Sequence, residues 1–297
     1  MFPPAAEYSA PPATSSVRSH IVGDVQGGIP LAVISDMRNV LSGCVSGGCL
    51  LAVALPVTTA SPALEQRVTV YQVEKPVAVG RMALGRFTLS QLGILEKLNR
   101  ADLDHLARLS EQVVPGWWAS DELAYSALPA HYPSGARIPT LLVVHLPGQA
   151  FGAYEFGTLV RWGPLNSGGR QDPTPAGLFH LNWRSAGHAS TVNPAWFLRW
   201  YFNFGNREGL AFHEYALPGG PASHGCIRLL ARDARWLFDW GDAWSLDRSG
   251  VRILNAGTPV FIVGQYDFDA PPPWRSPTWL SHAVDLPALD VDQDSTS

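Results

Sequence analysis

The spacing of apolar positions predicts a strand followed by helices in the first third of the chain. Apolar residues largely alternate with polar ones over 67–73, which is typical of a strand, and Pro76 ends this run. Leucines then recur every three or four positions, which predicts one or two amphipathic helices over 88–112. Asp102 is the expected N-cap of the second helix. We therefore expect a small helical or mixed module over residues 63–137.

Beyond a turn-rich link at 129–139, the pattern changes to short strands. β-prone runs occupy residues 140–145, 150–156, 158–162, 177–183, 210–213 and 258–263. Glycine- and proline-containing turns between several of these runs favour antiparallel hairpins, and 231–240 reads as a helix. The fold class we expect is mainly β (α+β), with a β-sandwich or barrel over residues 138–264.

The two ends of the chain are expected to lie outside this fold. Residues 1–62 contain the apolar run from Cys49 to Val57, which resembles a secretory signal peptide whose true start is Met37. The alternative is a buried core segment. Because a membrane span needs about 20 apolar residues, we expect no integral membrane segment in the mature chain. Residues 265–297 are rich in proline and acidic residues, which predicts a disordered tail.

Composition narrows the possible functions. The 297 residues are 46% hydrophobic and 15% charged, which is compatible with a buried core. The net charge is −4 and basic residues occur singly, so the chain shows no electrostatic footprint for nucleic acid. Removal of a leader with Cys44 and Cys49 would leave Cys226 unpaired in an oxidising compartment, which suggests a reactive thiol. The alternative is a small buried hydrophobe.

The residues around Cys226 could support covalent chemistry. A thiol reacts as its thiolate, whose formation is favoured by a nearby imidazole, by cationic groups and by backbone N–H donors. His213 lies thirteen positions earlier, across a Pro- and Gly-rich loop that could fold back, and Arg228 follows two positions later. Gly225 has no side chain to block an approaching carbonyl, so its N–H and that of Cys226 could meet a developing oxyanion.

These residues carry a family resemblance. The string S-H-G-C-I-R-L at 223–229, preceded by a histidine and followed by Asp233-Ala234, resembles the signature of the L,D-transpeptidase (YkuD-type) catalytic domain. The resemblance includes Ser167-Gly168-Gly169 and residues 174–177, and it covers about 138–264. It implies an exported enzyme, in the periplasm or cell wall, that acts on peptidoglycan stem peptides without a cofactor.

The resemblance also implies roles for individual residues. Cys226 would form a thioester with the substrate acyl group, His213 would activate the thiol, and the backbone carbonyl of Glu214 would orient the imidazole. The backbone N–H of Gly225 would stabilise the oxyanion. The expected substrate-binding or loop-anchoring residues are Ser223, His224 and Arg228.

Several alternatives remain open from the sequence. With water as acceptor, the same fold would act as an L,D-carboxypeptidase or amidase. Without catalytic activity, it would be a cell-wall-binding protein. His213, His224 and Cys226 could instead supply three zinc ligands, although no H-E-x-x-H motif is present. The strand–helix–helix order of residues 63–137 is loosely similar to a LysM module, and the alternative is a small helical subdomain.

Overall fold

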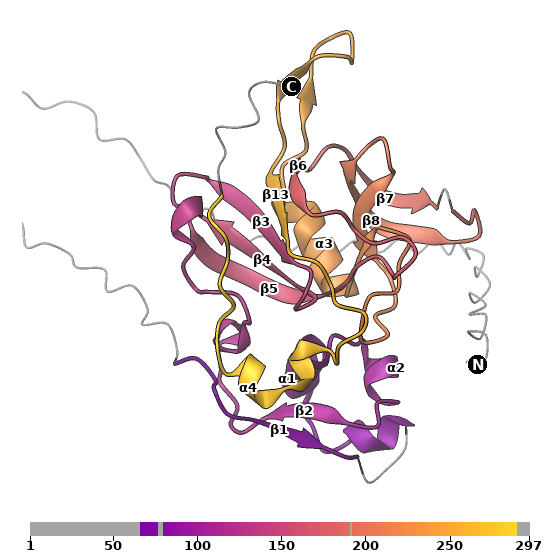
Figure 1. Ribbon diagram of the computed structural model, residues 1–297. Helices are drawn as coiled ribbons and strands as arrows, with labels where there is room; N and C mark the ends of the chain where they lie inside the picture. Colours follow the sequence, from indigo (N-terminus) through magenta and orange to yellow (C-terminus); the bar gives the residue numbers. More distant parts are fainter. Residues whose placement is uncertain (1–65, 77–79, 191, 290–297) are drawn as a thin grey trace, which may run out of the picture. The chain divides into compact units, whose positions relative to one another are not determined.

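The structure is a computed structural model that describes residues 66–76, 80–190 and 192–289 (Figure 1). The expected leader at 1–62, with Met37 and two of the cysteines, lies outside these residues. Within the part of the chain that is described, no helix is both long and apolar enough to cross a membrane.

A nine-stranded sheet organises the protein, in the order β6-β13-β3-β4-β5-β10-β9-β8-β7. Its strands are β3 (Thr140–His145), β4 (Ala150–Glu155), β5 (Thr158–Asn166), β6 (Gly177–His180), β7 (Arg184–Ala189), β8 (Phe197–Gly205), β9 (Leu210–Glu214), β10 (Ile227–Leu229) and β13 (Pro259–Val263). Neighbouring strands are antiparallel except for β13–β3 and β10–β9, which are parallel. A separate hairpin pairs β11 (Ser245–Leu246) with β12 (Ile253–Asn255).

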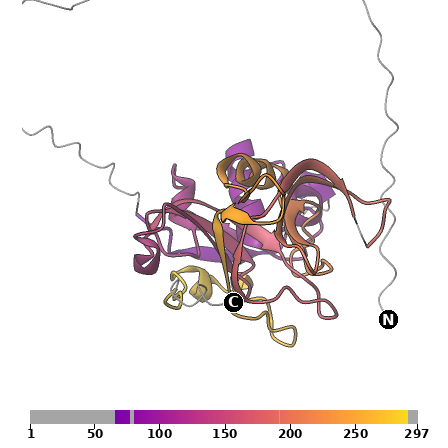
Figure 2. The same cartoon turned by 90° about the horizontal axis from the view of Figure 1, so that it is seen from above.

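The sheet curls because its two edge strands, β6 and β7, are consecutive in sequence. Only residues 181–183 separate them, and this link is hydrogen-bonded to β8 through Asn182 N to Asn203 O (2.8 Å) and Asn203 N to Trp183 O (2.9 Å). Figure 1 shows α3 (Ala231–Trp240) between the β3–β5 strands and the β7–β8 strands, and Figure 2 shows the same fold from above. The mainly β class that the sequence predicted is confirmed.

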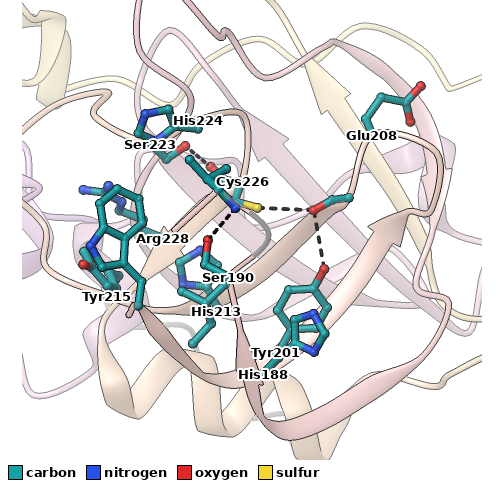
Figure 3. A pocket seen from close by; sticks show the side chains of 14 residues that line it. His188, Ser190, Tyr201, Glu208, His213, Tyr215, Ser223, His224, Cys226 and Arg228 are labelled. Carbon is teal, nitrogen blue, oxygen red and sulfur yellow. Dashed lines mark hydrogen bonds between the residues drawn. The ribbon is translucent and has the colours of Figure 1, made fainter. Parts of the chain in front are cut away.

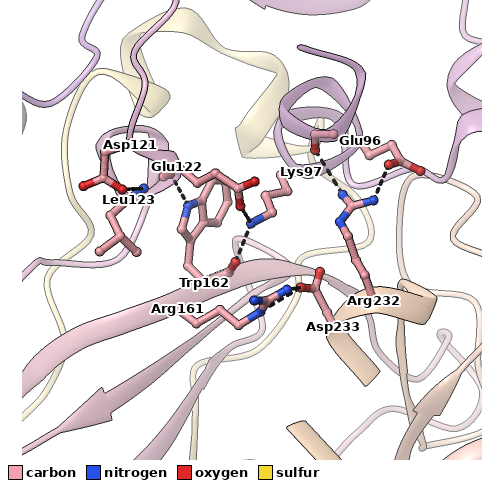
Figure 4. Close-up of polar contacts among 10 residues, drawn as sticks. Glu96, Lys97, Asp121, Glu122, Leu123, Arg161, Trp162, Arg232 and Asp233 are labelled. Carbon is pink, nitrogen blue, oxygen red and sulfur yellow. Dashed lines mark hydrogen bonds and ion pairs between the residues drawn. The ribbon is translucent and has the colours of Figure 1, made fainter. Parts of the chain in front are cut away.

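Apolar side chains from both halves of the curled sheet meet in one core. Fully buried members include Leu142, Phe151, Leu165, Phe202, Ile227, Leu229 and Val260. Helix α3 adds Ala234 and Leu237 to this core. Its buried Asp233 is held by Arg161 of β5, whose Nη2 lies 2.6 Å from Asp233 Oδ1 (Figure 4).

The N-terminal module has the strand–helix–helix order expected from the sequence. Strands β1 (Tyr71–Glu74) and β2 (Gln112–Pro115) pair antiparallel, with α1 (Leu89–Asn99) and α2 (Leu103–Leu106) between them in sequence. Asp102 caps α2 as predicted. The LysM assignment stays a prediction. Short 3-10 helices are η1 (Gly80–Leu84), η2 (Glu122–Tyr125) and η3 (Pro133–Gly135).

A buried lysine joins this module to the sheet. Lys97 of α1 is 1% exposed, and its Nζ donates to Glu122 Oε2 and to Trp162 O of β5 (Figure 4). A buried ammonium is costly unless it is paired and hydrogen-bonded. These contacts therefore fix α1 against β5.

The expectation of a disordered tail over 265–297 is wrong for residues 265–289. This segment forms η4 (Pro273–Arg275) and α4 (Pro277–Leu280), and Trp274 is 1% exposed in a core shared with the N-terminal module. Two hydrogen bonds tie it down further, from Val284 N to Ala127 O (2.8 Å) and from Tyr132 Oη to Pro287 O (2.6 Å). Its few large apolar side chains pack against residues from a much earlier part of the chain. The local composition does not reveal these contacts.

Candidate active site

Strand pairing brings His213 and Cys226 to neighbouring positions. His213 lies on β9, and Cys226 directly precedes β10. The two strands run parallel with Arg228 opposite His213 and Ile227 opposite Phe212. Cys226 therefore lies at the level of Ala211, two positions from His213, and because side chains two positions apart share a face of the sheet, both reactive side chains lie on the same face. Together with Ser223, His224 and Arg228 they line a single pocket (Figure 3).

His213 is buried as a neutral imidazole. It is 4% exposed, and burial, helped by the nearby Arg228 charge, lowers its pKa to about 4 even though the contact with Glu214 opposes the shift. Its Nδ1 lies 3.0 Å from Glu214 O, the contact that the sequence predicted. Because a carbonyl only accepts, Nδ1 carries the hydrogen and Nε2 is left as the basic nitrogen.

Cys226 is held as a thiol, which differs from the thiolate that the sequence predicted. Burial raises the pKa of the Cys226 thiol, and the opposing effects of the Ala211 backbone N–H and of Arg228 are smaller. The Cys226 Sγ donates to Gly209 O at 3.6 Å (Figure 3). The pair at rest is therefore a neutral thiol and a neutral imidazole, because the enclosing strands disfavour charge on both.

The backbone at Gly225 and Cys226 offers two free donors. Gly225 has φ +92°, and a Cβ there would lie 2.9 Å from Leu210 Cδ2, so this position requires glycine. Within the described ranges, neither the Gly225 N–H nor the Cys226 N–H has a protein acceptor. Two adjacent N–H groups beside a nucleophile form the arrangement that stabilises an oxyanion.

A neighbouring loop clamps the nucleophile loop (residues 222–226). Thr174 Oγ1 donates to Gly225 O at 2.7 Å and accepts from Gly168 N at 2.9 Å. A Cβ at Gly168 would lie 2.0 Å from a backbone carbonyl oxygen, which explains the glycine in the upstream motif. Ser223 is buried and its hydroxyl donates to Cys226 O, so it anchors the loop at the edge of the pocket that it also lines.

Arg228 presents a positive charge to the pocket. Its guanidinium carbon lies 4.6 Å from the centroid of the Tyr215 ring, and no carboxylate in the described part of the chain pairs with it. The Glu214 carboxylate lies near Arg199 instead (3.7 Å), so Glu214 serves the site through its carbonyl alone. The predicted role of Arg228 in carboxylate binding is thus compatible with its surroundings.

The far wall of the pocket comes from residues that sequence reasoning largely missed. His188 and Ser190 belong to the β7–β8 hairpin, and Glu208 to the turn before β9. The aromatic run at 196–202 was a signal for this wall, and Trp196 and Tyr201 do line the pocket. His224 is exposed and its ring lies 5.7 Å from that of Trp196.

The zinc alternative finds no support in this geometry. Among the residues that the structure describes, no group of three or more His, Cys, Asp or Glu side chains is placed to hold a metal ion. The exposed His224 ring packs against Trp196 and does not converge with His213 and Cys226 on one point.

A comparison with protein families found a match to the central part of the chain. Residues 139–262 match the family model described as the L,D-transpeptidase catalytic domain, YkuD. An L,D-transpeptidase structure from Stackebrandtia nassauensis aligns at 22% identity with a TM-score of 0.38, covering 48% of this chain and 63% of its own. One from Xylanimonas cellulosilytica aligns at 26% identity and 0.39, covering 58% and 78%. Mycobacterium tuberculosis L,D-transpeptidase 1 aligns at 21% and 0.32, covering 42% and 62%.

The chain thus spans about three fifths of the length of these relatives: the alignment covers 63% of the Stackebrandtia chain and 62% of the Mycobacterium chain. No curated protein matches it.

Proposed function

We propose that the protein is a cysteine L,D-transpeptidase of peptidoglycan stem peptides, on the premise that residues 139–262 match the family model of the L,D-transpeptidase (YkuD) catalytic domain. The observation that carries the proposal is a neutral thiol and a neutral imidazole lining one pocket beside two unused backbone N–H donors. This set contains a nucleophile, a base and an oxyanion site, which acyl transfer requires.

In the first step, Cys226 Sγ attacks the amide carbonyl between the L-centre of the diaminoacyl residue and the terminal D-alanine. His213 Nε2 takes the thiol proton as the S–C bond forms, so charge appears only in the presence of substrate. The carbonyl oxygen becomes an oxyanion, which the Gly225 and Cys226 N–H groups stabilise. The C–N bond then breaks, and the imidazolium gives its proton to the departing amine of D-alanine.

In the second step, an acceptor amine attacks the thioester on Cys226. His213 removes a proton from the attacking amine and returns it to the sulfur when the C–S bond breaks. Arg228 is the proposed partner of a substrate carboxylate, since it is the cation that lines the pocket. Division of one substitution into two is the general advantage of a covalent nucleophile.

The decisive experiment is mass spectrometry of muropeptides incubated with the purified protein. Cross-linked dimers, absent with Cys226→Ala, are the expected products. Trimmed monomers alone would mean that water is the acceptor and that the protein is a carboxypeptidase or amidase. If Cys226→Ala retained turnover, or if the wild-type protein bound peptidoglycan without forming an acyl-enzyme, the transpeptidase proposal would be wrong.

We also propose that the protein is exported to the periplasm or cell wall, because peptidoglycan lies outside the cytoplasm. N-terminal sequencing of the protein from the cell envelope tests this proposal. A mature start near Ser61 is expected, and a retained residue 1–60 segment would contradict it.

A further inference from the structure

The corner between α1 and α2 touches the loop that joins the candidate base to the nucleophile. Helix α1 ends at Asn99, and the left-handed backbone of its C-cap Arg100 (φ 56°) turns the chain. Ala101 then forms a β-bridge with Pro218, and Asp102 N donates to Leu217 O at 3.0 Å. In return, Leu217 N donates to Asp102 Oδ2 at 2.7 Å. The module thus grips a segment 115 residues away in sequence.

The Asp102 carboxylate divides its two oxygens between two tasks. Its Oδ1 accepts from His105 N at 3.0 Å and caps α2, while Oδ2 accepts from Leu217 N. The His105 ring Nδ1 lies 2.8 Å from Oδ1 and 2.9 Å from Oδ2, so it contacts both oxygens. Burial alone would raise the pKa of Asp102, but the hydrogen bonds from His105 and Leu217 outweigh it and lower that pKa. The group is therefore an anion at neutral pH, and its bond to Leu217 is charge-assisted.

The gripped segment continues into the pocket wall. Leu217 is fully buried and belongs to the linking loop (residues 215–221). Tyr215 begins this loop, and its N–H donates to Leu229 O at 3.2 Å. The loop is therefore held at two points two residues apart. The Tyr215 ring in turn lies under the Arg228 guanidinium, inside the pocket.

We propose that Asp102 is a positioning residue, which holds the linking loop so that the Tyr215 ring keeps Arg228 aimed at a substrate carboxylate. The identity of that carboxylate, on the stem peptide, rests on the proposed function. Asp102 does not set the geometry of the reacting atoms, because the β9–β10 ladder independently fixes the backbone of His213 and of the residues next to Cys226. Loss of this contact should therefore weaken carboxylate recognition more than it changes the reaction of the thiol with a neutral reagent, which feels Arg228 only through the pKa values of Cys226 and His213.

Asp102→Asn separates the two tasks of the side chain. Asparagine caps a helix as well as aspartate does, but its amide NH₂ would face the Leu217 N–H, so that the cap is kept and the loop contact is lost. The substitution also removes the charged contact with the His105 ring, which His105→Ala reports separately. Asp102→Ser is a second variant with the same logic, because serine caps α2 and has no second oxygen. Thr88→Ala is the matched control, since it removes the cap at the other end of α1, far from the linking loop.

The assay compares alkylation of Cys226 by iodoacetate, an anion, and by iodoacetamide, which is neutral. Rates are followed on the Cys226 peptide by mass spectrometry, with Arg228→Gln as the reference for a lost charge. In Asp102→Asn we expect the iodoacetate-to-iodoacetamide rate ratio to fall about threefold, a size typical of a partly exposed ion pair. The iodoacetamide rate should change less than the iodoacetate rate, and the ratio in Thr88→Ala should match the wild type.

With stem peptide, the same variant should raise KM about fivefold at nearly unchanged kcat, the pattern of lost uniform binding. A wild-type rate ratio in both Asp102 variants would overturn the positioning role, as would an equal fall in Thr88→Ala. If the wild-type protein does not turn over stem peptide, the proposed function fails, whereas the alkylation ratio still decides the role of Asp102.

Discussion

At neutral pH we expect Cys226 to keep its proton in the free protein, and the structure allows the size of this preference to be worked out. Burial lowers the pKa of His213 to about 4 and raises that of Cys226 above its ordinary value. With an ordinary thiol near 8.5, the pKa gap is at least ~4.5 units, so proton transfer costs at least ~6 kcal/mol. If substrate-free Cys226 and His213 approached to about 4 Å, the attraction between the two charges would return about 4 kcal/mol at an effective dielectric constant of 20.

The remaining cost of about 2 kcal/mol limits the thiolate–imidazolium form to a few per cent of molecules. Ultraviolet absorbance of the thiolate measures this fraction directly. The spectrum of Cys226→Ser is subtracted from that of the wild type over a pH titration, which cancels the signal of Cys44 and Cys49. We expect the thiolate step only above the ordinary thiol pKa. A thiolate signal near one equivalent per chain at neutral pH would refute this reasoning.

Three further predictions concern stability and the clamp on the nucleophile loop. Burial and the Arg100 charge lower the pKa of His145 to about 4, so its contribution to the free energy of unfolding is present above pH ~6.5 and falls by about 2 kcal/mol at pH 5. In urea unfolding between these two pH values, the His145→Asn variant should lose about 2 kcal/mol less stability than the wild type. Equal pH dependence of the two proteins would contradict this. Trp274→Ala should lower the free energy of unfolding by about 3–5 kcal/mol. Trp117→Ala, at a 38% exposed site, should lower it far less. Similar urea midpoints of the two variants would argue against a buried Trp274. Thr174→Val should slow acylation by about tenfold, because misplacement of reacting groups is costly, and Thr174→Ser should restore it; a fully active valine variant would show that the clamp is dispensable.

Short sequence motifs allowed much of the candidate site to be predicted from the sequence. Cys226, His213 and the Glu214 carbonyl were predictable because their spacing lies within one strand–loop–strand unit, and Gly225 because its backbone needs a positive φ. The charge states were not predictable. They depend on how deeply the neighbouring strands enclose the thiol and the imidazole, and the cation at Arg228 had suggested the opposite for the thiol.

The missed elements share a different cause, since their structure depends on distant partners. Strand β7 reads R-S-A-G-H-A, which lacks β-branched and large apolar residues, and it forms because β8 offers it an edge. The bond between Asp102 and Leu217 joins two segments with no common motif. The segment at 265–289 looked disordered because the prolines at 271–273 dominate its composition, although Trp274 follows directly.

The buried position of Trp274 has a consequence for biosynthesis. The N-terminal module, with Val68, Tyr71 and Leu98 in its core, lacks a central side chain of that core until residue 274 has been synthesised. Strand β13, which lies inside the sheet between β6 and β3, is also synthesised after all its neighbours in the sheet. Nascent chains that stop before residue 259 would therefore expose unpaired strand edges and an open core.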